Sequence, residues 1–178
     1  MRKQIYICLF VLIFALTGCG SSNDEELEIK DSVQTFLEGY QSLDGSIGEY
    51  LAEYDKSNLQ FNGFQSILAQ QMTFEIGKVE HSDDGYLVNA KISNVDFQAA
   101  FEEIIEEYTV DDTEEDILKK LCIKLGDESA KRKDFEVEIV IQQIKDVYEI
   151  ILTPELSNAL LGGYNEYLTS LIGGMINE

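Results

Sequence analysis

The chain has 178 residues, and its 34 acidic side chains outnumber the 13 basic ones, which gives a formal net charge of −21. Such acidity argues against nucleic acid as a partner, because nucleic-acid binding depends on neutralising phosphates. It also argues against adsorption onto an anionic membrane surface. The length predicts one domain, and the single Pro leaves no linker between domains.

The first element along the chain is a short apolar segment with basic residues before it. Arg2 and Lys3 precede an unbroken apolar run over residues 5–16, which is the layout of a secretion signal. A helix that crosses a membrane needs about twenty apolar residues, so this run is too short for a permanent span. We expect the segment to be removed after export, and an ordinary cleaved signal with a free Cys19 is the alternative.

The apolar run ends in Leu16-Thr17-Gly18-Cys19, which resembles the lipobox of bacterial lipoproteins. The resemblance implies cleavage between Gly18 and Cys19 and attachment of a diacylglycerol, with acyl chains such as palmitate, to the Cys19 thiol. Two acyl chains hold a protein to a bilayer where one barely does. The implied location is the extracytoplasmic side of the cell membrane of a Gram-positive bacterium.

This cleavage divides the chain into three parts. Residues 1–18 form the removed signal, residues 19–26 form the lipidated Cys with a flexible tether, and residues 27–178 form a single extracytoplasmic α+β domain. Loss of Arg2 and Lys3 leaves 11 basic against 34 acidic side chains, a formal charge of −23. No internal disulfide is expected, because Cys122 is then the one cysteine without a lipid.

Helical spacing of apolar residues predicts three opening helices. The first carries Ile29, Val33, Phe36, Leu37 and Tyr40, the second runs from Ile47 to Tyr54, and the third covers residues 58–71. Alternation then predicts two strands, from Met72 to about His81 and from Tyr86 to Ile92. Asp83-Asp84-Gly85 between them is a turn signal, so these strands form a hairpin.

Two further helices are predicted from capping signals. Ser93 and Asp96 have the spacing of a capping box, and apolar residues follow on one face from Phe97 to Tyr108. Thr113 and Asp116 offer a second cap for a helix through Leu125, extending as far as Lys131.

The last third of the chain predicts a second hairpin and a closing helix. Phe135 to Gln142 and Val147 to Leu152 are strands, and Lys145-Asp146 turns between them. Thr153-Pro154 begins the final helix, since Pro is accommodated at the first helical position. This helix runs to Leu171, and Gly162-Gly163 should weaken or bend it.

The predicted fold class is α+β, a curved antiparallel sheet of about four strands in two hairpins, wrapped by about six helices. Three stretches of the chain resemble a group of small Gram-positive lipoproteins. They are the hairpin end Val88-Asn89-Ala90-Lys91-Ile92-Ser93-Asn94-Val95-Asp96, residues 135–152, and Asn158-Ala159-Leu160-Leu161-Gly162-Gly163. That resemblance implies a cystatin-like, nuclear transport factor 2-like domain, in which Tyr148 stands where relatives often have Trp. The group has no settled activity to carry over.

Each residue that could take part in catalysis or ligand binding also has a simpler structural interpretation. His81, the one histidine, lies beside a polar turn and is expected to be exposed. Asp96 is expected to cap a helix, and Cys122 to be a small buried apolar residue. The acidic clusters 80–84 and 111–116 lack the spacing of a calcium loop. Tyr40, Tyr50, Tyr54, Tyr164 and Tyr167 can line a ligand cavity or belong to the core.

No catalytic, metal or cofactor residues are therefore assigned, and Gly18 and Cys19 are the site residues that the sequence predicts. The leading hypothesis is a non-enzymatic module, held to the membrane through a diacylglycerol on Cys19, that binds a small ligand or an envelope protein. One alternative is an enzyme of the nuclear transport factor 2-like fold with an Asp/Tyr acid–base site inside the cone that the sheet and the helices form. The other alternative is a structural or assembly protein, in one version a dimer whose two copies pack through the faces of their sheets.

Overall fold

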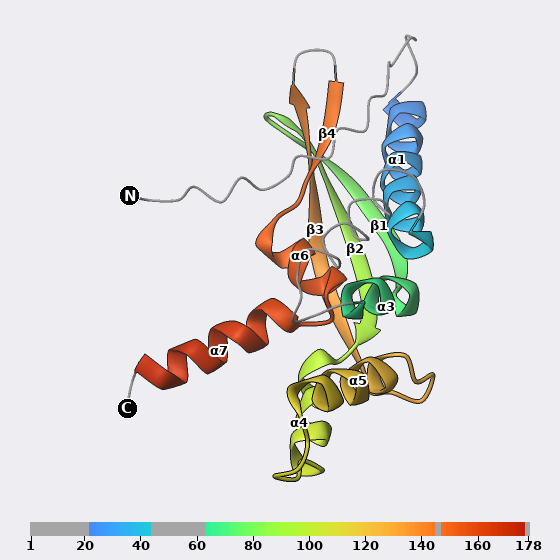
Figure 1. Ribbon diagram of the computed structural model, residues 1–178. Coiled ribbons are helices and arrows are strands. Elements are labelled where there is room, and N and C mark those ends of the chain that lie inside the picture. Colours follow the sequence, from blue (N-terminus) through green and yellow to red (C-terminus); the bar gives the residue numbers. More distant parts are fainter. Residues whose placement is uncertain (1–21, 44–62, 145–146, 177–178) are drawn as a thin grey trace.

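The computed structural model describes residues 22–43, 63–144 and 147–176, which form an α+β fold (Figure 1). One open antiparallel sheet has its strands in chain order: β1 (Thr73–Ser82), β2 (Gly85–Val95), β3 (Arg132–Ile144) and β4 (Val147–Ile151). The two predicted hairpins are confirmed. The sheet adds the pairing of β2 with β3, in which Ile92 lies opposite Phe135, so the two hairpins join as one meander.

Six helices are described: α1 (Ser22–Ser42), α3 (Phe64–Gln71), α4 (Phe97–Glu106), α5 (Glu114–Leu125), α6 (Pro154–Leu160) and α7 (Tyr164–Ile176). The predicted helix from Ile47 to Tyr54, and the beginning of the one over 58–71, lie outside the described residues. Residues 22–26, which the sequence assigned to a flexible tether, are instead the first residues of α1.

Both α1 and α6 cover the same face of the sheet (Figure 1). Side chains alternate across a strand, so β2 turns Val88, Ala90 and Ile92 to this face, where all three are buried. Val33 and Leu37 of α1 are fully buried among them. An antiparallel sheet that is covered on one face keeps the other face polar.

Charged side chains occupy the other face of the sheet. Lys91 lies between Glu75 on β1 and Glu136 on β3 in the strand register, and its ammonium group pairs with Asp134 at 2.8 Å. These groups are partly or fully exposed to solvent. On β2 and β3 the polar residues of this face are therefore at least partly exposed, whereas Glu149 of β4 is buried.

A second apolar core lies beyond the end of the sheet, between α3, α4 and α5, at the far end of the molecule from the beginning of α1 (Figure 1). Its buried members are Phe64, Leu68, Val95, Phe97, Ala100, Ile104, Leu121 and Leu125. Glu103 of α4 forms ion pairs with Lys124 of α5 and with Lys131. The helical pair α4–α5 is thus held to the end of β2 and β3 by its own core.

The structure corrects two predicted helix ends. Ser93 is a strand residue and not a cap, because β2 continues to Val95 and Asp96 alone is the N-cap of α4. At the other end of the pair, α5 stops at Leu125 and does not approach Lys131, since Gly126 is its C-cap. The capping box of Thr113 and Asp116 at the beginning of α5 is confirmed.

The predicted closing helix is two helices. Gly162 and Gly163 have φ values of 60° and 87°, a left-handed conformation that Gly adopts without the strain other residues would incur. The two glycines therefore end α6 and redirect the chain into α7, which runs away from the sheet (Figure 1).

Candidate functional site

The predicted lipidation site lies just ahead of the first described helix. Gly18 and Cys19 are outside the described residues, and Gly20 and Ser21 are the two residues between Cys19 and the beginning of α1 at Ser22. Three residue steps span at most about 11 Å. A lipid on Cys19 would therefore keep the beginning of α1 close to the bilayer surface.

A phenol–carboxylate pair lies at this same end of the domain. Glu25 is in the first turn of α1 and Tyr86 is the second residue of β2, and the Tyr86 hydroxyl donates a hydrogen bond to Glu25 Oε1. Tyr86 is 4% exposed. The bond attaches the beginning of α1 to the sheet across 61 positions of sequence.

Two more rings surround the Tyr86 phenol. His81 is its register partner on β1, with ring centroids 4.8 Å apart. Tyr148 of β4 lies on the other side, with centroids 5.5 Å apart. Tilted aromatic pairs at these distances stabilise one another beyond their buried area. We call Glu25, His81, Tyr86 and Tyr148 the tether-end cluster.

Burial, and next the hydrogen bond to Glu25, raise the pKa of the Tyr86 phenol. The phenol therefore stays protonated at physiological pH. A protonated phenol whose hydrogen already lies on a carboxylate is a hydrogen-bond donor and a poor general base. In the tether-end cluster the Tyr86–Glu25 bond thus serves to hold two elements together.

The other carboxylate considered from the sequence, Asp96, caps α4. Its Oδ1 accepts a hydrogen bond from the backbone N–H of Ala99 at 3.1 Å. That is the geometry of an N-cap residue. The capping role predicted for Asp96 is confirmed, and it places the carboxylate at the junction of β2 and α4.

Tyr40, Tyr164 and Tyr167 belong to the two cores. The Tyr40 side chain is buried, with its hydroxyl 3.5 Å from the carbonyl oxygen of Leu160. Tyr164 lies against Phe64 and Phe97 with ring centroids 5.2 and 4.9 Å away. Their interpretation as core residues is confirmed, whereas Tyr50 and Tyr54 lie outside the described residues.

His81 is exposed as predicted, whereas Cys122 is less buried than predicted. His81 is exposed beside the β1–β2 turn, although the ring contact with Tyr86 was not foreseen. Cys122 is half-buried on α5 and packs against the second core.

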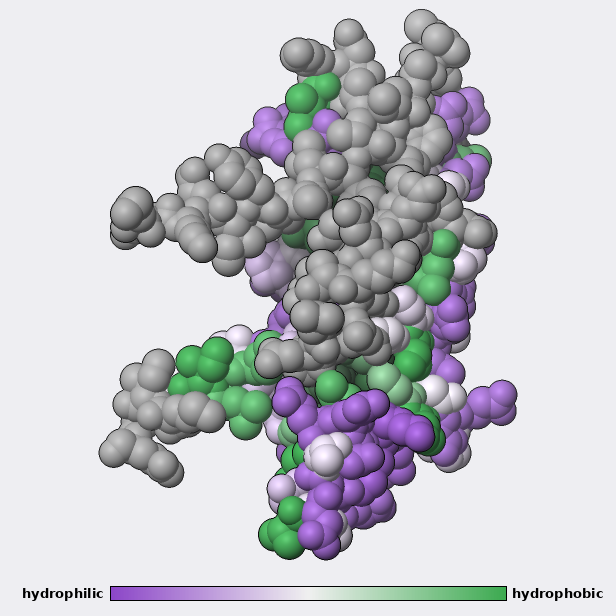
Figure 2. All heavy atoms as spheres, in the orientation of Figure 1, coloured by the Kyte–Doolittle hydropathy of each residue, from purple (hydrophilic) through white to green (hydrophobic). Residues whose placement is uncertain are grey.

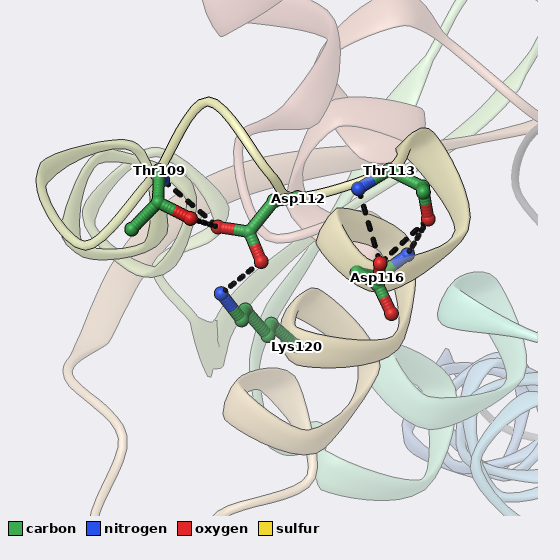
Figure 3. Close-up of polar contacts among 5 residues, drawn as sticks. All are labelled: Thr109, Asp112, Thr113, Asp116 and Lys120. Atoms are coloured by element: carbon green, nitrogen blue, oxygen red, sulfur yellow. Dashed lines mark hydrogen bonds and ion pairs between the residues drawn. The ribbon is translucent and has the colours of Figure 1, made fainter.

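The acidic segment 111–116 is organised by hydrogen bonds between its own residues and their neighbours (Figure 3). Asp112 accepts from the backbone and side chain of Thr109 and pairs with Lys120 at 2.8 Å. Asp116 and Thr113 bond to one another as a capping box. Among the described residues, no three His, Cys, Asp or Glu side chains are grouped to hold a metal ion.

One buried carboxylate oxygen has no hydrogen-bond partner in the described part of the chain. It is Oε2 of Glu149 on β4, whose residue is 7% exposed. Glu149 alternates with Tyr148 and Ile150, so it lies on the opposite face of the sheet from the tether-end cluster. It is therefore not an acid–base partner of Tyr86.

Sequence reasoning missed the pair of Glu25 and Tyr86. Glu25 stood in an acidic run that favours solvent, and Tyr86 in an alternating strand that favours the core. No short spacing joins them. The one local signal was the Asp83-Asp84-Gly85 turn, which brings Tyr86 back beside His81.

Comparison of the chain with models of protein families, with curated proteins and with solved structures found no match. Of the helices that the structure describes, none combines the length and the apolar character that crossing a bilayer requires.

Proposed function

We propose that this chain is a membrane-anchored extracytoplasmic lipoprotein, with a diacylglycerol on Cys19, whose domain is a non-enzymatic binding module for a small ligand or an envelope protein. The observation that carries the proposal is the order Leu16-Thr17-Gly18-Cys19 after a twelve-residue apolar run. The beginning of α1 at Ser22 supports the proposed anchoring, because the first helix then begins three residues after the lipidated Cys19.

The tether-end cluster lies at the end of the domain from which the proposed anchor would extend. The Tyr86–Glu25 bond attaches α1 to the sheet within its first turn. A lipid on Cys19 therefore places the β1–β2 turn near the bilayer and the α4–α5 pair away from it (Figure 1). The acidic domain is repelled by anionic lipids, so the end with α4 and α5 is the one offered to other molecules.

The anchor is tested in a bacterium that acylates its lipoproteins, with the full chain and the variant Cys19→Ser. We expect intact-mass spectrometry of the membrane fraction to find a product that begins at Cys19 and carries acyl chains. Cys19→Ser abolishes that product. Cys8→Ser is the matched control, since Cys8 belongs to the removed segment. A product with Met1 retained, or with Cys19 cleaved but unmodified, contradicts the proposal.

An enzyme with an Asp/Tyr acid–base site is the second candidate, although the carboxylate that contacts Tyr86 is Glu25 and the protonated phenol acts there as a hydrogen-bond donor. The two candidates differ in what Tyr86→Phe does. If the pair is catalytic, a turnover found with envelope substrates disappears in Tyr86→Phe while the fold remains. If the domain only binds, the lipidated protein isolated in mild detergent retains its ligand or partner and shows no turnover.

A further inference from the structure

The apolar stripe of α7 continues beyond the body of the protein. In its first turns, Tyr167 contacts Phe97 and Phe101 with ring centroids 6.1 and 5.7 Å away. One turn further along the same side of the helix, Leu171 is 40% exposed and its neighbour Ile172 is 58% exposed. Figure 2 shows apolar residues gathered on this projecting part of α7.

This stripe is also uncharged in a strongly anionic chain. Residues 167–177 contain no Asp, Glu, Lys, Arg or His, whereas the whole chain carries a net charge of −21. Glu166, which precedes this segment, is paired with Lys133 at 3.0 Å, and Glu178 follows it in the sequence. Two copies that approach through most other surfaces bring carboxylates together, and juxtaposed like charges cost several kcal/mol. The projecting part of α7 avoids that repulsion.

The height of α7 above the anchor argues for a protein and against lipid as its occupant. The Lys133–Glu166 pair fixes the beginning of α7 near the beginning of β3. The tether-end cluster lies at the other end of that strand, since Tyr86 is opposite Ile141. Lys133 and Ile141 are eight residues apart on β3, which separates the two positions by roughly 25 Å. When the tether-end cluster faces the membrane, α7 therefore lies away from the bilayer surface.

We infer that the exposed stripe of α7, centred on Leu171 and Ile172, docks against α7 of a second copy of this chain in the same membrane. The inference rests on the proposed anchoring, because two copies tethered at the same residue carry α7 at the same height. A two-fold axis along the membrane normal then makes the contact self-complementary. The interface is α7, not the face of the sheet.

The size of the patch fits an association that depends on anchoring. Stable dimers bury about 800 Å² on each partner, and part of one helix offers less than that. Tethering two copies to one membrane raises their effective concentration, which strengthens a weak contact without adding area. We therefore expect the pair in membranes and mainly single chains in dilute detergent solution.

The test places a photo-crosslinking amino acid at Ile172 of the full chain, in cells that also make a second copy with a different tag. We expect ultraviolet light to give an adduct of two chains that carries both tags. The same amino acid at Ile123, which is 66% exposed on α5, should give none. Leu171→Glu in both copies should reduce the Ile172 adduct more than about tenfold through like-charge repulsion, and Ile123→Glu should leave it unchanged.

An adduct of Ile172 with lipid or with a different protein overturns the inference, as does the absence of any adduct. Leu171 is exposed, so Leu171→Glu is expected to fold, and the circular dichroism spectrum of each variant checks this. The acylation of Cys19 is measured in the same membranes by intact mass. A two-chain adduct without acylation would sink the proposed anchor alone, and acylation without the adduct would sink the α7 contact alone.

Discussion

The side-chain amide of Asn94 donates a hydrogen bond to the carbonyl oxygen of Leu160, 2.9 Å away, in a fully buried position. Asn94 Oδ1 also accepts from the backbone N–H of Val95 at 2.8 Å. Leu160 belongs to the core under the sheet and Val95 to the second core. One amide therefore joins the end of β2 to the end of α6 where the two cores meet.

The variant Asn94→Ala should be strongly destabilised. It leaves the Val95 N–H without its side-chain partner and leaves the Leu160 carbonyl with only the longer contact from the Tyr40 hydroxyl, and a buried group left unsatisfied costs about 1–3 kcal/mol. Urea unfolding of the mature protein measures the loss. The control is Asn89→Ala, since Asn89 is exposed on the other face of β2 and should change stability little. Equal effects of the two variants would show that the buried amide contributes nothing.

Gly162→Ala should destabilise the protein more than Gly163→Ala. A Cβ on Gly162 would lie 2.2 Å from the carbonyl oxygen of Val95, whereas on Gly163 its nearest neighbour would be 3.5 Å away. Both residues have positive φ, which costs about 1–2 kcal/mol for a residue with a Cβ. Only Gly162→Ala adds a clash with backbone.

Thermal unfolding of both variants separates the cost of a positive φ, which they share, from the cost of the clash with the Val95 carbonyl, which only Gly162→Ala has. We expect a moderate fall in the unfolding temperature for Gly163→Ala and a much larger one, or failure to fold, for Gly162→Ala. The reverse order would mean that the backbone of Val95 moves aside at little cost. In that case the hydrogen bond from Phe97 N–H to Gly162 O, at 3.0 Å, would not be a tight constraint.

The sequence predicted elements well where the signal was local, and poorly where tertiary contacts decided. Alternation found the four strands of the described sheet, and the Thr113–Asp116 spacing found the capping box of α5. The same kind of spacing at Ser93 was misleading, because pairing with Asp134 on β3 keeps Ser93 in the sheet. Helical residues 22–26 were missed because acidic residues before an apolar stripe indicate solvent but do not distinguish helix from coil.

The site was harder to predict than the fold. The lipobox is a contiguous motif, so it can be read from four residues and remains a prediction. The pair of Glu25 and Tyr86 depends on how α1 is placed over the sheet, and no spacing in the sequence encodes that placement. The apolar residues of α7 looked like ordinary core residues, because nothing in their pattern tells where the body of the protein ends.

Replacing Tyr86 with Phe should loosen the beginning of α1 without unfolding the domain. The variant keeps the ring contacts with His81 and Tyr148 and loses the bond to Glu25. Hydrogen bonds to charged groups contribute about 1.5–3 kcal/mol, and a part-buried one should lie near the lower value. Hydrogen exchange of residues 24–30 should become faster, while exchange in β2 and β3 stays slow.

The control for Tyr86→Phe is Tyr108→Phe, because Tyr108 is exposed at the far end of the molecule. A double-mutant cycle with Glu25→Gln isolates the pair. If Tyr86→Phe has the same effect whether residue 25 is Glu or Gln, the charge of Glu25 does not contribute to the contact.

Acid should remove the stabilisation that Asp112 provides. Its ion pair with Lys120, and next its bond from the Thr109 backbone, lower the pKa of the Asp112 carboxyl from 3.8 to about 2. A carboxyl whose pKa is lower in the folded state stabilises the fold above its unfolded pKa, and that contribution disappears as the pH falls through the folded pKa. The loss should therefore occur between about pH 4 and pH 2.

Lys120→Met removes the largest cause of the lowered pKa, so the Asp112 carboxyl should titrate nearer to its ordinary value in this variant. Urea unfolding at neutral pH should show Lys120→Met less stable than the parent, and the difference should shrink as the pH falls towards 2, where the Asp112 carboxyl of the parent is half protonated, and vanish below it. Lys119→Met is the matched control, because Lys119 is exposed on the same helix. A difference between Lys120→Met and the parent that persists undiminished in acid would assign the effect of Lys120 to the packing of its aliphatic chain and not to its charge.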